Sequence, residues 1–300
     1  MMKTMEGEEM KPSHRNLVGM LVLALTVVWF GGSAWATNLP DTWSPLKQAL
    51  FGDRPLQEGM IQLEAPEVAQ DAATVTVSIK VDAAQSAERF VKTLHLIVDR
   101  NPIPIAAIFH LTPESGRANL STRIRLQTYS HVRAIATMSD GALYMSAKLV
   151  KASGGCTAPV GQNAAEAKAR LGEMRIRTEG DVKLNQPNRA QLLVRHPQHN
   201  GLQKELFSGF YIGADYITSI TLSYGGKVFM KADTGFALSQ NPSLHFYFVP
   251  QGSGALVASI TDTENRTFTH SVPISPKVAS SSRSVRRSTG DGRLAIRNSR

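Results

Sequence analysis

Alternation of apolar and polar residues is the main pattern in the first half of the chain. It is clearest at 73–82, where every second residue is apolar, namely Val75, Val77, Ile79 and Val81. A period of two is typical of a half-buried β-strand. Further strands are predicted at 91–99, 105–111, 120–126, 131–138 and 142–150, each bounded by turn residues such as Asn101-Pro102 and Ser139-Asp140-Gly141. In strand 120–126, Ile124 and Leu126 are expected to point inward and Arg123 and Arg125 outward.

The second half repeats this pattern after residue 174. Strands are predicted at 175–179, 189–195, 217–224, 227–232, 244–249, 255–261 and 266–272. Gly225-Gly226 is a strong hairpin signal between two of them. A short amphipathic segment at 43–51 is predicted to form one or two helical turns. The pattern therefore predicts an all-β protein with two immunoglobulin-like β-sandwich domains.

A segment of small residues separates the two sets of strands. It runs Lys151-Ala152-Ser153-Gly154-Gly155-Cys156-Thr157-Ala158-Pro159-Val160-Gly161, and it is followed by an Ala-, Glu- and Arg-rich stretch that predicts a short helix at 164–174. The predicted layout is a signal peptide at 1–36, a sandwich at 37–150, a linker at 151–173, a sandwich at 174–275 and a basic disordered tail at 276–300. We expect the two sandwiches to associate within the chain.

Composition adds two constraints. The 300 residues are 42% hydrophobic and 19% charged, which is ordinary for globular protein. The formal net charge of +9 comes mostly from arginines of the tail, so it gives no indication of a nucleic-acid-binding surface. We expect no nucleic-acid partner.

The N-terminus has the features of an export signal. Lys11 and Arg15 precede an uncharged apolar run at 17–30, and Ala34-Trp35-Ala36 supplies a small-x-small cleavage pattern. We expect export to the periplasm by a Sec-type route with cleavage after Ala36. If the segment were retained, 17–36 would be long enough for a membrane anchor.

Cys156 is the only cysteine, and it lies in the small-residue segment. In an oxidising compartment a lone cysteine cannot form an internal disulfide, so it is free, pairs between chains or carries something. Because Gly154 and Gly155 suit a flexible arm, we expect an exposed thiol with a reach on the order of 20 Å. The contrary possibility is a buried, inert cysteine, and a sulfur enclosed in a hydrophobic interior would contradict the hypothesis.

Several short motifs carry a resemblance to known proteins. In the second half they are His196-Pro197 with Gly201, Ile217-Thr218-Ser219-Ile220, Tyr224-Gly225-Gly226-Lys227-Val228-Phe229, Ser239-Gln240-Asn241-Pro242 with Phe246, and Thr261-Asp262. This half resembles SoxZ, and the first half resembles SoxY, which ends in a Gly-Gly-Cys-Gly-Gly arm. The chain as a whole is similar to the fused SoxYZ-like carriers associated with quinoprotein dehydrogenases. Here the arm is internal, and Thr157-Ala158 replaces the second glycine pair.

The resemblance implies a carrier and not an enzyme. Cys156 would hold a sulfur-containing or other thiol-linked intermediate, as in the oxidation of thiosulfate, and Gly154 and Gly155 would form its arm. The implied partners are periplasmic redox enzymes, either sulfur-oxidation proteins or a quinoprotein dehydrogenase or cytochrome c. No cofactor is expected.

Three other functions remain open. A Cys-His hydrolase would need His131, His196 or His199 beside Cys156, although no nucleophile signature surrounds the cysteine. A metal site could use His196-x-x-His199, although Pro197 precludes a helical pair and no carboxylate motif follows. The main alternative is a non-covalent immunoglobulin-like adaptor that docks a dehydrogenase or cytochrome.

Overall fold

The computed structural model describes residues 41–158 and 169–278. The predicted signal peptide, residues 164–168 of the predicted short helix and nearly all of the basic tail lie outside these residues, and 170–172 within that predicted helix form a turn. The first half contains α2 (Trp43–Phe51), β1 (Leu56–Gln57), β2 (Ile61–Glu64), β3 (Val75–Val81), β4 (Val91–Val98), β5 (Ile105–Leu111), the 3₁₀ turn η1 (Pro113–Ser115), β6 (Leu120–Ile124), β7 (Ser130–Met138) and β8 (Leu143–Val150). The second half contains β9 (Met174–Thr178), β10 (Asn188–Val194), β11 (Ile217–Tyr224), β12 (Lys227–Thr234), β13 (Ser243–Phe248), β14 (Gly254–Asp262) and β15 (Thr267–Ile274).

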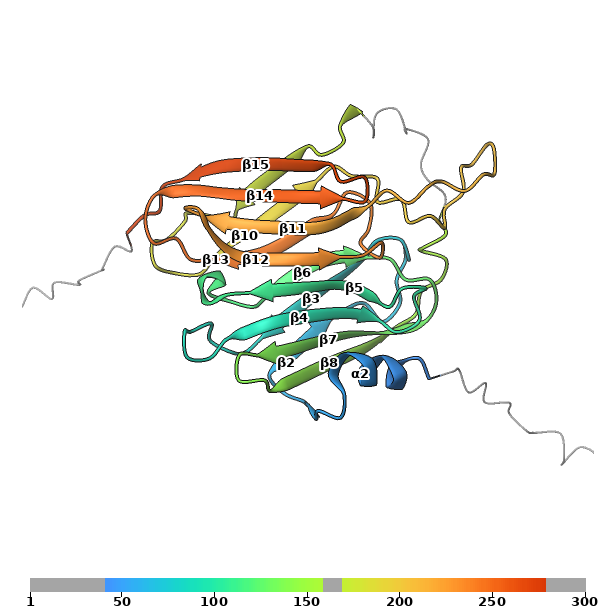
Figure 1. The fold of residues 1–300 in the computed structure, drawn as a ribbon, viewed down its shortest axis with the longest axis horizontal. Coiled ribbons are helices and arrows are strands. Elements are labelled where there is room, and N and C mark those ends of the chain that lie inside the picture. The colour runs from blue at the N-terminus through green and yellow to red at the C-terminus, as the bar shows by residue number, and fades with distance from the viewer. Residues whose placement is uncertain (1–40, 159–168, 279–300) are drawn as a thin grey trace, which may run out of the picture. The chain divides into compact units, whose positions relative to one another are not determined.

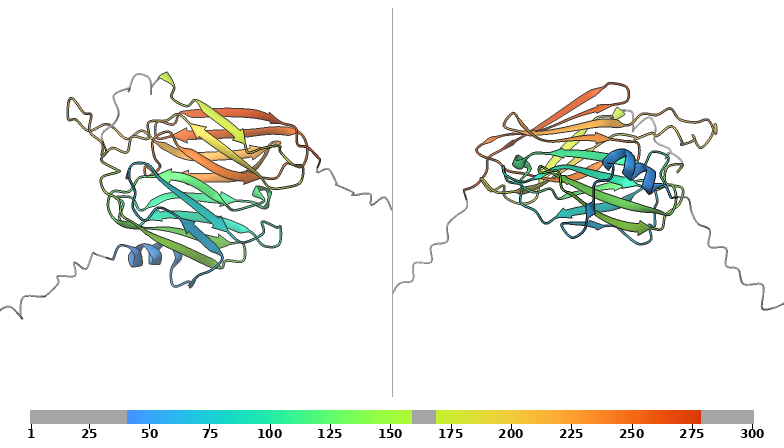
Figure 2. Two further views of the ribbon diagram at one scale, coloured as in Figure 1. Left: turned by 180° about the vertical axis from the view of Figure 1, so that it is seen from behind. Right: turned by 60° about the horizontal axis from the view of Figure 1, so that its bottom comes forward.

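The strands form two sheets that lie against each other (Figure 1, Figure 2). The nine-stranded sheet has the order β1-β8-β7-β4-β5-β12-β11-β14-β15, and the six-stranded sheet has the order β2-β3-β6-β13-β10-β9. The all-β immunoglobulin-like class is therefore confirmed. The predicted strands agree with the observed ones to within two residues, while β1 and β2 were missed because they are too short to show a period.

Both halves contribute strands to both sheets. In the nine-stranded sheet β5 pairs antiparallel with β12, from Met230 opposite Leu111 to Thr234 opposite Ala107. In the six-stranded sheet β13 meets β6 at His245 and Ser121. Without this pairing β5 and β12 would be exposed sheet edges, which tend to aggregate. The expected association of the two halves is confirmed.

The hydrophobic core is also shared by the two halves. One continuous cluster of buried side chains includes Phe109 from β5, Phe229 from β12 and Phe246 from β13. A smaller cluster forms where Phe51 of α2 packs on Ile97 and Leu143. This confirms the predicted helical turns at 43–51. Because the core is shared, the segment after β8 in the first half and the loop 196–216 in the second half are held in fixed positions relative to each other.

Among the described residues, no helix has both the length and the apolar character that crossing a lipid bilayer requires.

Candidate functional site: a buried cysteine and the loop that covers it

The small-residue segment is packed against the first half of the protein, where the sequence predicted a mobile linker. After β8, the N–H of Lys151 donates to the carbonyl of Glu67 (2.8 Å), and its own carbonyl accepts from the N–H of Ala69 (3.0 Å). The N–H groups of Gly154 and Gly155 donate to the carbonyls of Gln127 (2.8 Å) and Leu126 (2.9 Å). These backbone bonds hold the segment against residues 67–69 and 126–127 as far as the described residues extend.

The two glycines are required for this packing, which corrects their prediction as a flexible arm. A Cβ atom on Gly155 would lie 2.0 Å from the carbonyl oxygen of Ala72 and 2.7 Å from that of Leu126, so no side chain fits. Gly154 has a φ of +80°, a backbone conformation that favours glycine, and nothing lies near its Cβ position. The sequence signal was real, but it reported close approach of two backbones and not mobility.

Cys156 is fully buried, which corrects the prediction of an exposed thiol. Its N–H donates to the side-chain oxygen of Gln127 (3.1 Å), and its carbonyl accepts from the side-chain amide of Asn200 (2.7 Å). The cysteine belongs to neither of the two hydrophobic clusters. Its immediate neighbour Thr157 is exposed. The polar contacts of the cysteine are therefore made by its backbone, while its side chain is shielded from solvent.

The charge nearest to the thiol comes from Arg125, which the alternation pattern had placed on the outside. β6 ends at Ile124, so the inward–outward alternation stops there and Arg125 turns into the protein. Its guanidinium donates to the carbonyls of Gln198 (2.6 Å) and Phe236 (3.3 Å). Burial lowers the pKa of Arg125 to about 10, so the group remains a cation at neutral pH.

The docked thiol is protonated at neutral pH. Burial raises the pKa of Cys156 to about 11, and the positive charge of Arg125 opposes this rise only in part. Because the thiolate is the reactive form of cysteine, the docked thiol is a weak nucleophile.

A long loop of the second half, residues 196–216, covers the segment. Besides Asn200, the side-chain amide of Gln203 donates to the carbonyl of Ala158 (3.2 Å). The base of the loop is closed by paired backbone bonds between His199 and Asp215 (2.8 Å each) and by the side-chain oxygen of Gln198, which accepts from the N–H of Ile217 (2.7 Å). Sequence analysis did not identify these amides as contacts of the cysteine, since their partners lie over 40 residues away.

The outer part of this loop is a hairpin, residues 204–211, that projects from the sandwich (gold in Figure 1). Its ends meet at Lys204 and Tyr211, and the N–H of Glu205 donates to the carbonyl of Phe210 (2.9 Å). Its apolar side chains are exposed: Leu206 57%, Phe207 83%, Phe210 76% and Tyr211 67%. Exposed apolar patches of this kind mark interaction surfaces.

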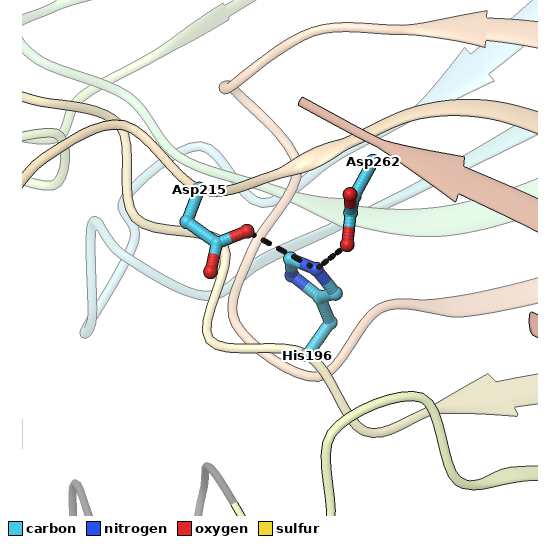
Figure 3. Close-up of side chains that lie close together, drawn as sticks. All are labelled: His196, Asp215 and Asp262. Atoms are coloured by element: carbon cyan, nitrogen blue, oxygen red, sulfur yellow. Dashed lines mark hydrogen bonds and ion pairs between the residues drawn. The ribbon is translucent and has the colours of Figure 1, made fainter. Parts of the chain in front are cut away.

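The histidines proposed for other functions are not assembled around the cysteine. In the described part of the chain no histidine forms a hydrogen bond with the Cys156 thiol, and His131 is exposed on β7. His196 and Asp262 are buried and Asp215 is half-buried, and the possible metal-ligand atoms of these three residues lie within 4.8 Å of one another (Figure 3). His199 is not part of this group. The structure therefore does not bring together the proposed His196–His199 pair.

The hydrogen bonds of His196 fit an ion-pair network better than a metal centre. Its Nδ1 accepts from the N–H of Gln198 (3.2 Å), so the proton of the neutral ring lies on Nε2, which faces Asp262 (3.5 Å) and Asp215 (3.6 Å). Arg266 binds both carboxylates, at 2.7 Å for Asp262 and 2.5 Å for Asp215. Burial lowers the pKa of His196. In this arrangement neither nitrogen of the His196 ring has a lone pair free for a metal. The ion-pair network instead anchors the base of the covering loop.

Comparison with known proteins gives two family matches in series. The profile described as "Sulfur oxidation protein SoxY" matches residues 47–156, and the profile described as "Sulphur oxidation protein SoxZ" matches residues 176–273. The first match ends at Cys156. None of the curated proteins matches the chain.

Solved structures give weaker likenesses. The sulfur carrier protein SoxY from Chlorobium limicola f thiosulfatophilum is 26% identical over 36% of this chain and 89% of its own, with a TM-score of 0.31. A superoxide reductase (neelaredoxin) from Ignicoccus hospitalis is 16% identical over 31% of this chain and 80% of its own, with a TM-score of 0.29.

Proposed function

The chain belongs to the SoxYZ-like proteins, with a SoxY domain and a SoxZ domain fused in one polypeptide, and on this basis we propose that Cys156 is the attachment point of a covalently carried sulfur intermediate. The family indicates a carrier or adaptor role in sulfur oxidation, as distinct from catalysis. The covalent step, its partners and its compartment are the parts that we add.

The observation that supports the proposal most is the position of Cys156 in a short segment that few hydrogen bonds hold against the rest of the protein. Gly155 and Cys156 are buried, whereas Ser153 and Thr157 on either side are exposed. The segment from Gly154 to Ala158 is held by the five hydrogen bonds described above. At about 1 kcal/mol each, these bonds give an undocking free energy on the order of 5 kcal/mol.

This arrangement makes the described state a closed, resting state. In it the thiol is protonated and shielded, so it is protected from adventitious oxidation. A partner that binds the open form better than the closed form by a comparable free energy would expose the thiol for loading. Once exposed, the thiol would recover an ordinary pKa and a reactive thiolate fraction.

The chemistry of loading explains why the partners are redox proteins. Joining the Cys156 sulfur to a sulfur atom of the cargo forms one S–S bond, releases the thiol proton and releases two electrons. These electrons need an acceptor, which a cytochrome or another redox enzyme supplies. Release of the cargo can then follow by thiol exchange, in which a thiolate attacks the cargo sulfur, a new S–S bond forms and Cys156 leaves as the thiolate.

The proposed compartment is the periplasm, because the features of residues 1–36 are those of a cleaved Sec-type signal. We expect the mature protein to begin at Thr37. Intact mass of the protein from the native host would show this, while a mass that includes residues 1–36 would indicate a retained anchor.

Complementation in cells tests the carrier function. In a host strain that lacks the protein, Cys156→Ser should abolish oxidation of the reduced sulfur compound on which the strain depends. Ser153→Ala, three residues away on the same segment, is the matched control and should complement fully. Full activity of Cys156→Ser at normal protein level would contradict the proposal.

A non-covalent adaptor is the second candidate, and two observations favour it. The thiol is buried with a raised pKa, and the hairpin 204–211 exposes four large apolar side chains at a projecting tip. An adaptor would keep its function in Cys156→Ser and lose it in Phe207→Ser/Phe210→Ser. A carrier that docks partners through the hairpin would lose function in both variants.

A further inference from the structure

A cavity of about 660 Å³ is lined by residues of the six-stranded sheet and by Thr269 and His270 of β15 in the nine-stranded sheet, apart from the residues that contact Cys156. Five arginines and one glutamate line it, namely Arg123, Arg170, Arg175, Arg177, Arg195 and Glu173. Its size is within the range of small-molecule sites. Its lining is unusual for such a site, because positive charge dominates it.

The arrangement follows from strand register. Arg175 and Arg177 alternate with the inward-facing Met174 and Ile176, so both guanidinium groups leave the core side of β9. Arg175 pairs with Leu193 of β10, and the N–H of Arg195 donates to the carbonyl of Glu173 (2.8 Å), which continues the same ladder. Arg123 approaches from β6 of the first half. Both halves of the chain therefore contribute to the cavity.

These guanidinium groups are poorly neutralised by the protein. Within the described residues, Arg175, Arg177 and Arg195 form no side-chain hydrogen bond or ion pair, whereas Arg89, Arg133, Arg189 and Arg266 each pair with a carboxylate. Glu173 is the only acidic residue among the described residues that line the cavity, and it is already bound to Arg170 (3.0 Å).

Arg123 adds an unsatisfied donor to the cavity wall. One of its terminal nitrogens donates to the carbonyl of Asn241 (2.9 Å), but its Nε is buried and has no hydrogen-bond partner among the described residues. A buried donor without a partner is costly, and like charges on neighbouring strands repel. A bound anion would relieve both costs.

We propose that this cavity binds a small, multiply charged oxyanion of the sulfate, thiosulfate or phosphate class. The guanidinium fork donates two parallel hydrogen bonds to such a group, and several forks from different strands match an anion with oxygens on several sides. The site is non-covalent and independent of Cys156. It would allow the carrier to hold an oxyanion that is not attached to its thiol.

Isothermal titration calorimetry of the full chain tests this site. Sulfate, thiosulfate and phosphate are titrated separately at constant ionic strength, with chloride as the background anion, so that general screening does not change. Saturable 1:1 binding of at least one of them is expected, and the ranking of the three distinguishes a sulfur oxyanion from phosphate.

Paired variants locate the binding. Arg175→Gln/Arg195→Gln changes two exposed side chains that have no hydrogen-bond or ion-pair partner among the described residues, and it should weaken binding at least about tenfold, since each charge-assisted bond contributes substantially. Arg123→Gln should also weaken it. Arg189→Gln is the matched control, because Arg189 lies on the same sheet but is paired with Glu179. The affinity of Arg189→Gln for the oxyanion should equal that of the unmodified protein.

The failure of this inference is distinguishable from failure of the carrier function. Cys156→Ser should bind the oxyanion with unchanged affinity, whatever its effect in cells. No saturable binding of any of the three anions would overturn the proposed site. Equal weakening in Arg189→Gln and in Arg175→Gln/Arg195→Gln would also overturn it, because that result indicates diffuse attraction to the surface.

Discussion

Two neighbouring loops of the protein reverse the usual relation between residue type and burial. The segment from Gly154 to Ala158 consists of small residues, yet Gly155 and Cys156 are buried. The hairpin 204–211 carries Leu206, Phe207, Phe210 and Tyr211, yet these side chains are exposed. The two loops also meet, since Asn200 and Gln203 at the base of the hairpin donate to the carbonyls of Cys156 and Ala158.

This difference in burial shows that the residue types of each loop fit the surface that the loop contacts. The small residues allow two backbones to come close, and the Cys156 side chain is then buried. The large residues of the hairpin remain in solvent, where another surface can bind them. One loop stores the reactive group, and the other presents a contact surface connected to the cover.

Of the substitutions proposed here, a change at Gly155 should destabilise the docked segment 154–158 most. In Gly155→Ala the new Cβ would meet two backbone carbonyls, and backbone cannot move aside cheaply. We expect the docked state to lose roughly 3 kcal/mol, so the alkylation of Cys156 by iodoacetamide should accelerate on the order of 100-fold. Quenched alkylation followed by mass spectrometry measures this.

The matched control is Gly213→Ala in the covering loop. Nothing lies within 4 Å of a Cβ at that position, so the alkylation rate should stay near that of the unmodified protein. Equal rates for Gly155→Ala and Gly213→Ala would show that Gly155 does not hold the segment closed.

Alkaline pH should release the thiol by a second route. The pKa of Cys156 is raised from 9.0 to about 11 in the folded state. The folded protein therefore keeps this proton after the unfolded chain has lost it, so the contribution of the thiol to stability is complete below pH 9 and is lost as the pH rises to 11. The loss amounts to about 2–3 kcal/mol.

Chemical denaturation across pH 8–11 measures this loss. The unmodified protein should lose stability relative to Cys156→Ser over that window, since the variant has no thiol to titrate while the other groups are common to both. Parallel pH profiles would mean that the cysteine reaches solvent in the folded protein.

The covering loop should contribute a smaller part of the closure. Asn200→Ala removes the amide that binds the carbonyl of Cys156, which costs about 1 kcal/mol and should raise the alkylation rate about fivefold. Gln191→Ala is the control, because that amide binds Ser243 (2.8 Å) on the sheet. A rate increase in Gln191→Ala as large as in Asn200→Ala would refute a specific role for the loop.

The exposed hairpin should have the least effect on stability. Phe207→Ser/Phe210→Ser removes two solvent-exposed rings, so the free energy of unfolding should change by less than about 0.5 kcal/mol. Phe246→Ser, which removes a fully buried ring, should by contrast prevent folding or destabilise by several kcal/mol. Thermal melts compare the three proteins, and a large loss of stability in the hairpin variant would mean that the rings pack against the protein.

The sequence predicted the sandwich well and the site only in part. The period of two in β3 is sufficient to identify a strand, because alternation is a local property. The burial of Cys156 depends on Ala72, Leu126 and Asn200, which are distant in the chain and carry no local signal. Gly154-Gly155 was correctly identified as special, but a glycine pair is equally consistent with mobility and with close packing.

The orientation of Arg125 was predicted wrongly for the same reason, since it depends on contacts that are distant in the chain. Alternation predicted an outward side chain, and the strand ended one residue earlier. Only tertiary contacts with Gln198 and Phe236 show that the guanidinium lies inside near the thiol. The alignment of Arg123, Arg175 and Arg195 around one cavity was hidden for the same reason, since it requires the pairing of strands from both halves.

The carried adduct itself is the most direct test of the proposed function. Protein isolated from its native host during growth on a reduced sulfur compound, without reductant, should show an intact-mass increase that maps to Cys156 and disappears when a thiol reductant is added. An unmodified thiol in every such preparation would contradict the account.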